Sequence, residues 1–142
     1  MTTLEQDVVH RKLRIIQQAL LELERVRGLS LVEYRADLWR RKAVERFLQE
    51  AIEAASDTAA HLLVSAGRPA PVDYFTGYLD LASLGVLTPE LARALAPSAG
   101  LRNRLVHEYD DLDDALVHAS VLRALDLLPQ FVKGVLGFLG RS

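Results

Sequence analysis

The sequence lacks cysteine altogether and has a single tryptophan and a single methionine in 142 residues. Without thiols the chain forms no disulfide, binds no metal through thiolates and has no cysteine nucleophile. It also lacks an apolar run near the ~20 residues that a membrane span requires, and residues 1–7 carry no secretory core. These absences are typical of a reducing compartment. We therefore expect a cytoplasmic protein with no membrane segment.

Several widespread catalytic motifs are absent as well. The sequence has no glycine-rich phosphate loop, no H-E-x-x-H helix, no Cys/His metal spacing and no G-x-S-x-G turn. We therefore expect neither a metal nor a cofactor. The formal net charge of −2 argues against a broad surface that coats nucleic acid, and we expect no DNA partner. A local basic cleft is compatible with this charge, because the distribution of charge decides that question.

What the chain does contain is apolar residues at helical spacing. They make up most of the 50% of the sequence that is hydrophobic, and no segment shows the sustained alternation typical of a strand. We predict an all-α fold: one domain over residues 1–142, built as an up-down bundle of about five helices with one crossover loop.

Capping signals divide this pattern into segments. The expected helices are residues 4–27; residues 34–63, entered through a capping box at Ser30 and Glu33 and either unusually long or bent once near Arg40; residues 74–84, between Asp73 and Gly85; residues 88–96, begun by Thr88 and Pro89; a helix carrying residues 102–107; and a helix from the acidic run 110–114. Pro129 is expected to kink or break the last helix, leaving an apolar tail over residues 131–139. Gly134 and Gly137 in this tail either permit close helix contact or weaken the helix.

Residues 100–109, GLRNRLVHEY, gather side chains suited to phosphate chemistry. The imidazole of His107 titrates near neutrality, since its ordinary pKa is about 6.5. The guanidinium of Arg102 keeps its charge and matches phosphate oxygens with a rigid fork. Together these groups are suited to hold a phosphodiester and to move protons on it. The simpler interpretation is a polar helix end with a solvated or acid-paired histidine.

The spacing of the two residues limits how they can cooperate. A five-residue step on a helix turns the chain through about 500°, which leaves Arg102 and His107 about 140° apart. Asn103 and Arg104 share the face of His107 instead. Two arrangements bring the pair together: a long arginine side chain that reaches round, or a second copy of the helix across a two-fold axis.

Other polar residues carry less specific signals. Asp57 and His61, four positions apart, form either a hydrogen-bonded pair on one helix face or a second polar group that faces the cleft. The basic cluster at residues 40–46 is either a solvated face or part of an RNA track. The neighbouring Trp39 either anchors a core or interface or stacks a base. Two further histidines are expected at the surface: His10 and His118.

Residues 100–109 resemble the signature of the HepT toxins, which belong to the HEPN superfamily of ribonucleases. The family motif is arginine, four residues, histidine, one residue, tyrosine. Arg102, His107 and Tyr109 fill it, and Asn103 is the usual polar residue after the arginine. The resemblance extends to further segments and so covers most of the chain: residues 44–61, 74–85 and 87–95.

This resemblance implies a HEPN-like helical homodimer in which two Arg/His pairs meet in a cleft at the interface. It implies metal-independent cleavage of RNA, often within tRNA, by attack of a ribose 2′-hydroxyl on the adjacent phosphorus. In that reaction His107 is the general base or acid and Arg102 neutralises charge on the phosphoryl oxygens. Asn103 orients the phosphate or the histidine.

The resemblance also implies a partner. HepT proteins are typically paired with a small nucleotidyltransferase antitoxin, MntA, which transfers AMP to the motif tyrosine, here Tyr109. On this basis we expect the toxin of a type VII toxin–antitoxin system. The alternative is a non-catalytic HEPN module that only binds a minimal nucleotidyltransferase, because binding-only relatives share the fold. The apolar tail and Trp39 are candidates for the partner contact.

Overall fold

The computed structural model describes residues 1–141, whose regular structure is entirely helical. Its helices are α1 (Thr3–Leu23), the 3₁₀ turn η1 (Glu24–Val26), α2 (Leu31–Arg35), α3 (Leu38–Ser65), α4 (Tyr74–Leu84), α5 (Pro89–Leu95), α6 (Ser98–His107) and α7 (Asp114–Arg141). The predicted all-α fold is confirmed. Five of the α-helices have ten or more residues, and the short α2 and α5 are additional to them.

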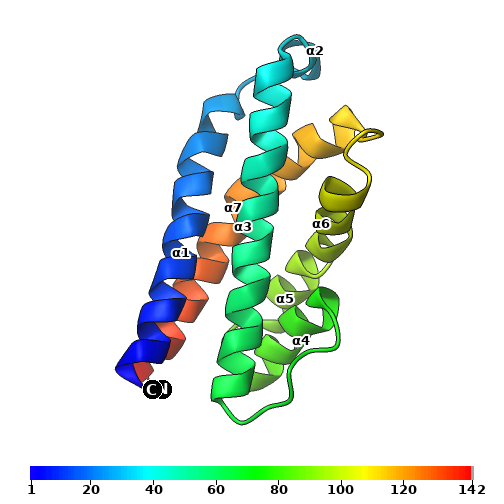
Figure 1. Cartoon of the computed structure of the whole chain (residues 1–142). Helices are drawn as coiled ribbons and strands as arrows, with labels where there is room; N and C mark the ends of the chain where they lie inside the picture. The colour runs from blue at the N-terminus through cyan, green and yellow to red at the C-terminus, as the bar shows by residue number, and fades with distance from the viewer. Residues whose placement is uncertain (142) are drawn as a thin grey trace.

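Helix α3 is the centre of the arrangement. It runs beside α1 along most of its length, and α7 passes behind the pair (Figure 1). Helices α4, α5 and α6 lie on the other side of α3, with α4 and α6 in direct contact with it (Figure 1). Side chains of α3 can therefore meet those of α6, the helix that carries residues 98–107.

The core has two adjoining parts. The larger joins α1, α3, α4, α5 and α7, and contains an edge-to-face ring pair between Tyr78 and Phe131, whose centroids are 6.1 Å apart. The smaller part gathers around the fully buried Tyr34 and Leu48 and includes Leu105, the buried residue of α6. Leu105 thus fixes α6 against the bundle, and the polar residues on either side of it lie nearer the surface.

The structure divides the predicted helix 34–63 into two. The Ser30–Glu33 capping box forms as expected, but it starts the five-residue helix α2. Asp37 then has an extended backbone, with φ −126° and ψ 112°, and its side chain accepts a hydrogen bond from the backbone N–H of Arg40. An aspartate at this position satisfies an otherwise unpaired N–H of a new helix. The predicted bend near Arg40 is therefore a break at Asp37.

Pro129 was predicted to kink or break the last helix, and the break does not occur. Helix α7 is continuous through Pro129, although proline removes one backbone hydrogen bond from a helix interior. The side chains of Leu125, Leu128 and Phe131 are buried on either side of it, so packing holds the helix together. Gly134 has a packing role, because a Cβ there would lie 2.8 Å from the carbonyl oxygen of Val86.

By length and composition alone, α7 is long and apolar enough to cross a membrane, with a hydropathy of 1.3 over its most apolar stretch. In the fold, α7 packs on α1, α2, α3 and α5. Its buried face supplies eight core residues, from Val117 to Leu139. One face of α7 thus packs in the bundle, while 33% of its most apolar stretch is buried.

Candidate active site

Helix α6 presents the predicted site residues from a short, weakly capped helix. It starts at Ser98 after Pro97, with no side-chain cap, and it ends at His107. Leu105 is buried against the smaller core, while Asn103, Arg104 and His107 are exposed. The helix is therefore anchored on its apolar side and free to present its polar side.

Arg102 is held by contacts with residues of α3, α4 and α6. Its Nε donates to Oε1 of Glu53 on α3 at 3.2 Å. Its guanidinium carbon lies 5.2 Å from the ring centroid of Tyr74 at the start of α4, in cation–π contact. Its Nη1 donates to Oδ1 of Asn103 at a long 3.5 Å. Three elements thus fix one side chain that is 22% exposed.

These contacts leave part of the arginine fork unused. A guanidinium has five N–H donors, and Glu53 takes the one on Nε. The Nη2 donors, and the Nη1 donor that does not face Asn103, have no partner within residues 1–141. The Nη edge is the one that matches two oxygens of a phosphate. Arg102 is therefore held in place from one side and available to an anion from the other.

Sequence reasoning missed Glu53 and Tyr74. Glu53 is 49 residues before Arg102 in the chain, and no local spacing links the two. Its carboxylate also accepts from Nε2 of Gln49 at 3.3 Å, one turn earlier on α3. The one available signal was that Glu53 falls inside the stretch of α3 that resembles the HepT family, but that resemblance gave it no role.

His107 occupies a different environment. It is the last residue of α6, and its exposed side chain makes no hydrogen bond with any residue in the described part of the chain. Since Arg102 turns toward α3 and α4, the roughly 140° between the two positions on α6 separates them within one chain. The structure of a single chain thus brings Arg102 together with Asn103, and does not bring it to His107.

Tyr109 lies beyond the end of α6 in the connection to α7. The side chain is 65% exposed. A turn follows in which the backbone N–H of Asp111 donates to the carbonyl of Glu108 at 3.0 Å. Asp113 then accepts from the N–H of Ala115 at 2.9 Å and caps α7. The acidic run therefore starts a helix, as predicted, and Tyr109 stands at the surface before it.

The predicted pair of Asp57 and His61 does not form. Asp57 accepts from Nζ of Lys12 at 3.3 Å, because α1 runs beside α3 at this level. Nε2 of His61 is buried and has no hydrogen-bond partner within residues 1–141. His118 is also not a free surface residue, since its Nε2 lies 2.7 Å from the carbonyl oxygen of Leu29.

The arginines of the basic cluster at residues 40–46 interact with nearby residues of α2 and α3. Arg40 and Arg41 donate to backbone carbonyls of α2, and Arg46 pairs with Glu50 at 2.9 Å. Arg40 is about 20 Å along α3 from Glu53, at 1.5 Å per residue. The end of the cluster at Arg40 is therefore remote from Arg102, whereas Arg46 is about 10 Å along α3 from Glu53. Trp39 is 87% exposed, which excludes a place in the core of the chain.

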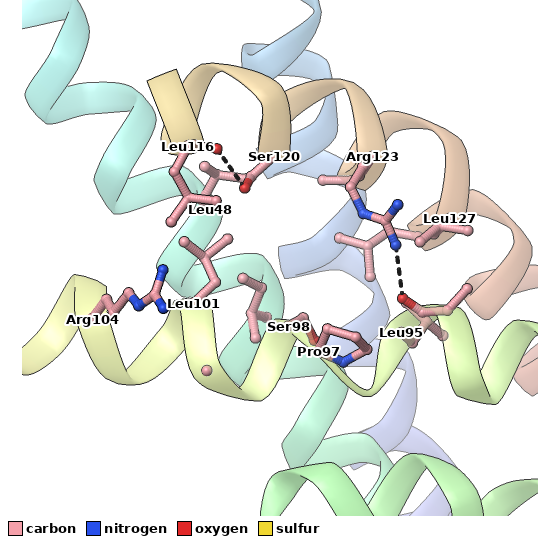
Figure 2. A pocket seen from close by; sticks show the side chains of 15 residues that line it. Leu48, Leu95, Pro97, Ser98, Leu101, Arg104, Leu116, Ser120, Arg123 and Leu127 are labelled. Atoms are coloured by element: carbon pink, nitrogen blue, oxygen red, sulfur yellow. Dashed lines mark hydrogen bonds between the residues drawn. The ribbon is translucent and has the colours of Figure 1, made fainter. Parts of the chain in front are cut away.

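Two hollows adjoin α6. The first, of about 230 Å³, lies between α3, the α5–α6 segment and α7, and is lined mainly by leucine and alanine side chains (Figure 2). Figure 2 shows Arg104 and Arg123 on opposite sides of it, and Arg123 donates to the carbonyl of Ala94 at 3.2 Å. Neither Arg102 nor His107 lines this hollow. The second lies between the start of α4 and the first turns of α6, beside Arg102.

Comparison with known proteins gives one consistent family. The family model described as Ribonuclease HepT-like matches residues 4–135. The protein named tRNA nuclease HepT, from Aphanizomenon flos-aquae, is 35% identical over 139 residues, which cover 98% of this chain and 95% of that protein. The protein named mRNA nuclease HepT, from Shewanella oneidensis, is 28% identical over 127 residues, which cover 89% of this chain and 94% of that protein.

A solved structure agrees with these sequence matches. The tri-AMPylated Shewanella oneidensis HEPN toxin, in complex with MNT antitoxin, superposes on this chain with a TM-score of 0.83 at 25% identity. The alignment covers 96% of this chain and 99% of the toxin chain. The whole helical arrangement is therefore shared, including the helix that carries residues 98–107.

Proposed function

Because the chain belongs to the ribonuclease HepT-like family, we propose that it is the endoribonuclease toxin of a type VII toxin–antitoxin system. Its substrate is RNA, with tRNA as the first class to test, since the relative of 35% identity is named a tRNA nuclease. The main structural support for this proposal is the way the guanidinium of Arg102 is held. It is fixed by Glu53 and Tyr74, while the Nη edge that suits a phosphate is unused.

The reaction follows from the chemistry of the two groups. The 2′-oxygen of a ribose attacks the adjacent phosphorus, the bond from phosphorus to the 5′-oxygen breaks, and a cyclic phosphate remains on the first fragment. His107 takes the proton of the attacking hydroxyl or gives one to the departing oxygen. Arg102 stabilises the charge that builds on the phosphoryl oxygens. Asn103 supports Arg102 from the neighbouring position on α6.

The active unit in this proposal is a homodimer with a composite site. One chain holds its own Arg102 and His107 about 140° apart on α6, so a working pair takes its arginine from one chain and its histidine from the other. A two-fold axis generates two such pairs in one cleft. The exposure of His107, which has no partner in the described chain, supports this arrangement.

Regulation in this proposal acts on Tyr109. A nucleotidyltransferase partner directs the phenol oxygen to the α-phosphorus of ATP, pyrophosphate leaves, and the phenol proton passes to a base of the transferase. The exposure of Tyr109, at 65%, supports access by such an enzyme. The added phosphate then pairs with Arg102 and the adenosine fills the cleft. After coexpression with the transferase, intact-mass and peptide analysis is expected to find AMP on Tyr109, and AMP on another residue alone would contradict this step.

The proposal further includes one domain over residues 1–142, a cytoplasmic location, and cleavage without a metal. Among residues 1–141, no three His, Asp or Glu side chains gather where they could hold a metal ion. The metal question is decided by cleavage in EDTA rather than by this arrangement. A nuclease that needs a metal loses activity in EDTA, whereas Arg/His chemistry retains it.

Mixed dimers test the composite site. Arg102→Ala and His107→Ala chains, with different affinity tags, are coexpressed and the heterodimer is purified through both tags. If arginine and histidine act across the interface, one of the two sites in this heterodimer is intact, and about half of the wild-type activity is expected.

The matched control is a heterodimer of wild type with the Arg102→Ala/His107→Ala double variant. It has the same composition of mutated residues, but each of its cross-interface pairs contains one lesion. This heterodimer is expected to be inactive. If it is active while the first heterodimer is inactive, the working pair lies within one chain and the composite site is wrong. If wild-type protein binds the nucleotidyltransferase and cleaves no RNA, the chain is a docking module.

A further inference from the structure

The second hollow is lined by two residues that contact Arg102, and the proposed reaction does not use it. Its volume is about 440 Å³, within the range of small-molecule sites. Its lining comes from the start of α4 and the first two turns of α6: Asp73, Tyr74, Phe75, Ala99, Gly100 and Asn103. Two of these residues also contact Arg102, namely Tyr74 through its ring and Asn103 through its amide oxygen. The hollow and the side chain of Arg102 therefore share two neighbours, Tyr74 and Asn103.

The side chains around this hollow suit a flat, polar-edged aromatic ring. Phe75 is 47% exposed, a large aromatic surface left without cover in the described chain. Tyr74 is different, because the guanidinium of Arg102 lies over its ring. Asn103 uses its amide oxygen toward Arg102, so its two N–H donors remain free. Asp73 accepts from Thr76 with Oδ1 only, so its second carboxylate oxygen is free.

The α6 side of the hollow is kept open by small residues. Ala99, Gly100 and Asn103 lie on one face of α6, at spacings of three and four residues. A Cβ placed on Gly100 meets no atom within 4 Å. Helix packing therefore does not require glycine here. A larger side chain at position 100 would instead reduce the volume of the hollow that Gly100 lines.

We propose that this hollow binds a nucleobase of the RNA substrate, from a nucleotide next to the phosphate held by Arg102. The base stacks on Phe75, and its edge receives hydrogen bonds from the Asn103 amide and donates to Asp73. Single-stranded RNA is commonly bound in this way, with unstacked bases placed on aromatic side chains and read along their edges. This inference rests on the proposed ribonuclease function and adds to it a position where the substrate is recognised.

The first test measures RNA affinity in full-length His107→Ala protein, which binds without cutting. A fluorescein-labelled RNA oligonucleotide that contains the mapped cleavage position is titrated with this protein and with the same protein carrying Phe75→Ala. Loss of one stacking contact is expected to raise Kd about tenfold. Phe75→Trp is expected to restore affinity, whereas Phe75→Leu, which keeps apolar area but no ring face, is expected to stay weak. Leu21→Ala, which removes an apolar side chain that is 72% exposed on α1, away from the hollow, is the control and is expected to leave Kd unchanged.

The second test asks whether Phe75 contacts a base or the RNA backbone. The oligonucleotide is made abasic at each position next to the cleavage site in turn. At one position the abasic RNA is expected to bind equally with and without the Phe75→Ala substitution, because the base that Phe75 contacts is gone. If no position removes the difference, Phe75 does not stack on a base and the inference is wrong.

The outcomes separate this inference from the proposed function. If Phe75→Ala leaves Kd unchanged while wild-type cleavage depends on His107, the base site is overturned and the ribonuclease remains intact. Dissociation of the dimer by Phe75→Ala, seen by sedimentation, assigns Phe75 to the subunit interface and also overturns the base site. Wild-type protein that neither binds nor cleaves RNA overturns both.

Discussion

Glu53→Gln separates two effects that the structure combines on Arg102. The carboxylate of Glu53 fixes the Nε side of the guanidinium at 3.2 Å. It also places a negative charge near the position of the substrate phosphate. Glutamine keeps an oxygen that accepts from Nε but removes the charge. Alanine at this position removes both. We therefore expect both variants to lower KM, and Glu53→Ala to lower kcat more than Glu53→Gln.

The size of the charge effect follows from distance and screening. A phosphate on the Nη edge of Arg102 lies about 7 Å from the Glu53 carboxylate, which corresponds to repulsion of about 0.6 kcal/mol in water and about 2.4 kcal/mol at an effective dielectric constant of about 20. The side chains of Arg102 and Glu53 are 22% and 32% exposed, so the environment is intermediate. Removal of the charge is therefore expected to favour RNA binding by about 1 kcal/mol, or a KM about fivefold lower.

The orientation effect acts on kcat. In Glu53→Ala the guanidinium keeps its contacts with Tyr74 and Asn103 but loses the fixed Nε bond. A small displacement of a charge-stabilising group is sufficient to lower kcat by about tenfold or more. In Glu53→Gln the fall in kcat is expected to be smaller, because an acceptor remains. Glu50→Gln, one turn earlier on α3 and paired with Arg46, is the control and is expected to leave both parameters unchanged.

Steady-state cleavage of a labelled RNA gives kcat and KM for the four proteins, and chemical denaturation of each verifies its stability. The expected pattern is a lower KM for both Glu53 variants and a larger fall in kcat for Glu53→Ala. Weaker RNA binding by Glu53→Gln would show that Glu53 does not face the phosphate. Wild-type kcat in Glu53→Ala would show that fixing Arg102 is irrelevant to the reaction.

Two other predictions concern the bundle. Gly134→Ala is expected to lower the free energy of unfolding by about 1–3 kcal/mol, because its Cβ would lie 2.8 Å from the carbonyl oxygen of Val86. Gly137→Ala has no such close contact and is expected to raise the free energy of unfolding by up to about 1 kcal/mol, because alanine has a higher helix propensity than glycine. Urea denaturation of the two variants and the wild type measures both effects. Tyr34→Phe is expected to raise stability at pH 7 by about 1 kcal/mol, since the Tyr34 hydroxyl is buried without a partner within residues 1–141. Burial also raises the pKa of the Tyr34 hydroxyl, so above the unfolded pKa of about 10 unfolding releases a proton and wild-type stability falls more steeply with pH than that of Tyr34→Phe. A denaturation series from pH 8 to 11 that falls equally for both proteins would contradict this.

Local signals in the sequence predicted most of the helix boundaries. Asp73 caps α4 and Gly85 ends it with a positive φ of 86°, where glycine is favoured. Thr88 caps α5 directly before Pro89. These features were predictable because each depends on residues within one turn of one another.

The errors came from interactions between distant residues. Pro129 is tolerated because α7 is buried against the rest of the bundle, and local propensity does not report that packing. Asp57 binds Lys12 instead of His61 because α1 passes beside it. In the candidate site, the motif on α6 could be recognised in the sequence. The contacts of Arg102 with Glu53 on α3 and Tyr74 on α4 could not. No spacing within one helix predicts such contacts.

The decisive measurement is cleavage of total RNA by purified protein, freed of its nucleotidyltransferase, in the presence of EDTA. Wild type and folded His107→Ala protein are compared at equal concentration, and stability is checked by denaturation. We expect discrete RNA fragments ending in cyclic phosphate from the wild type and none from the variant. Equal cleavage by both proteins, or none by an unmodified wild type, would contradict the assignment of Arg102 and His107 to a ribonuclease site.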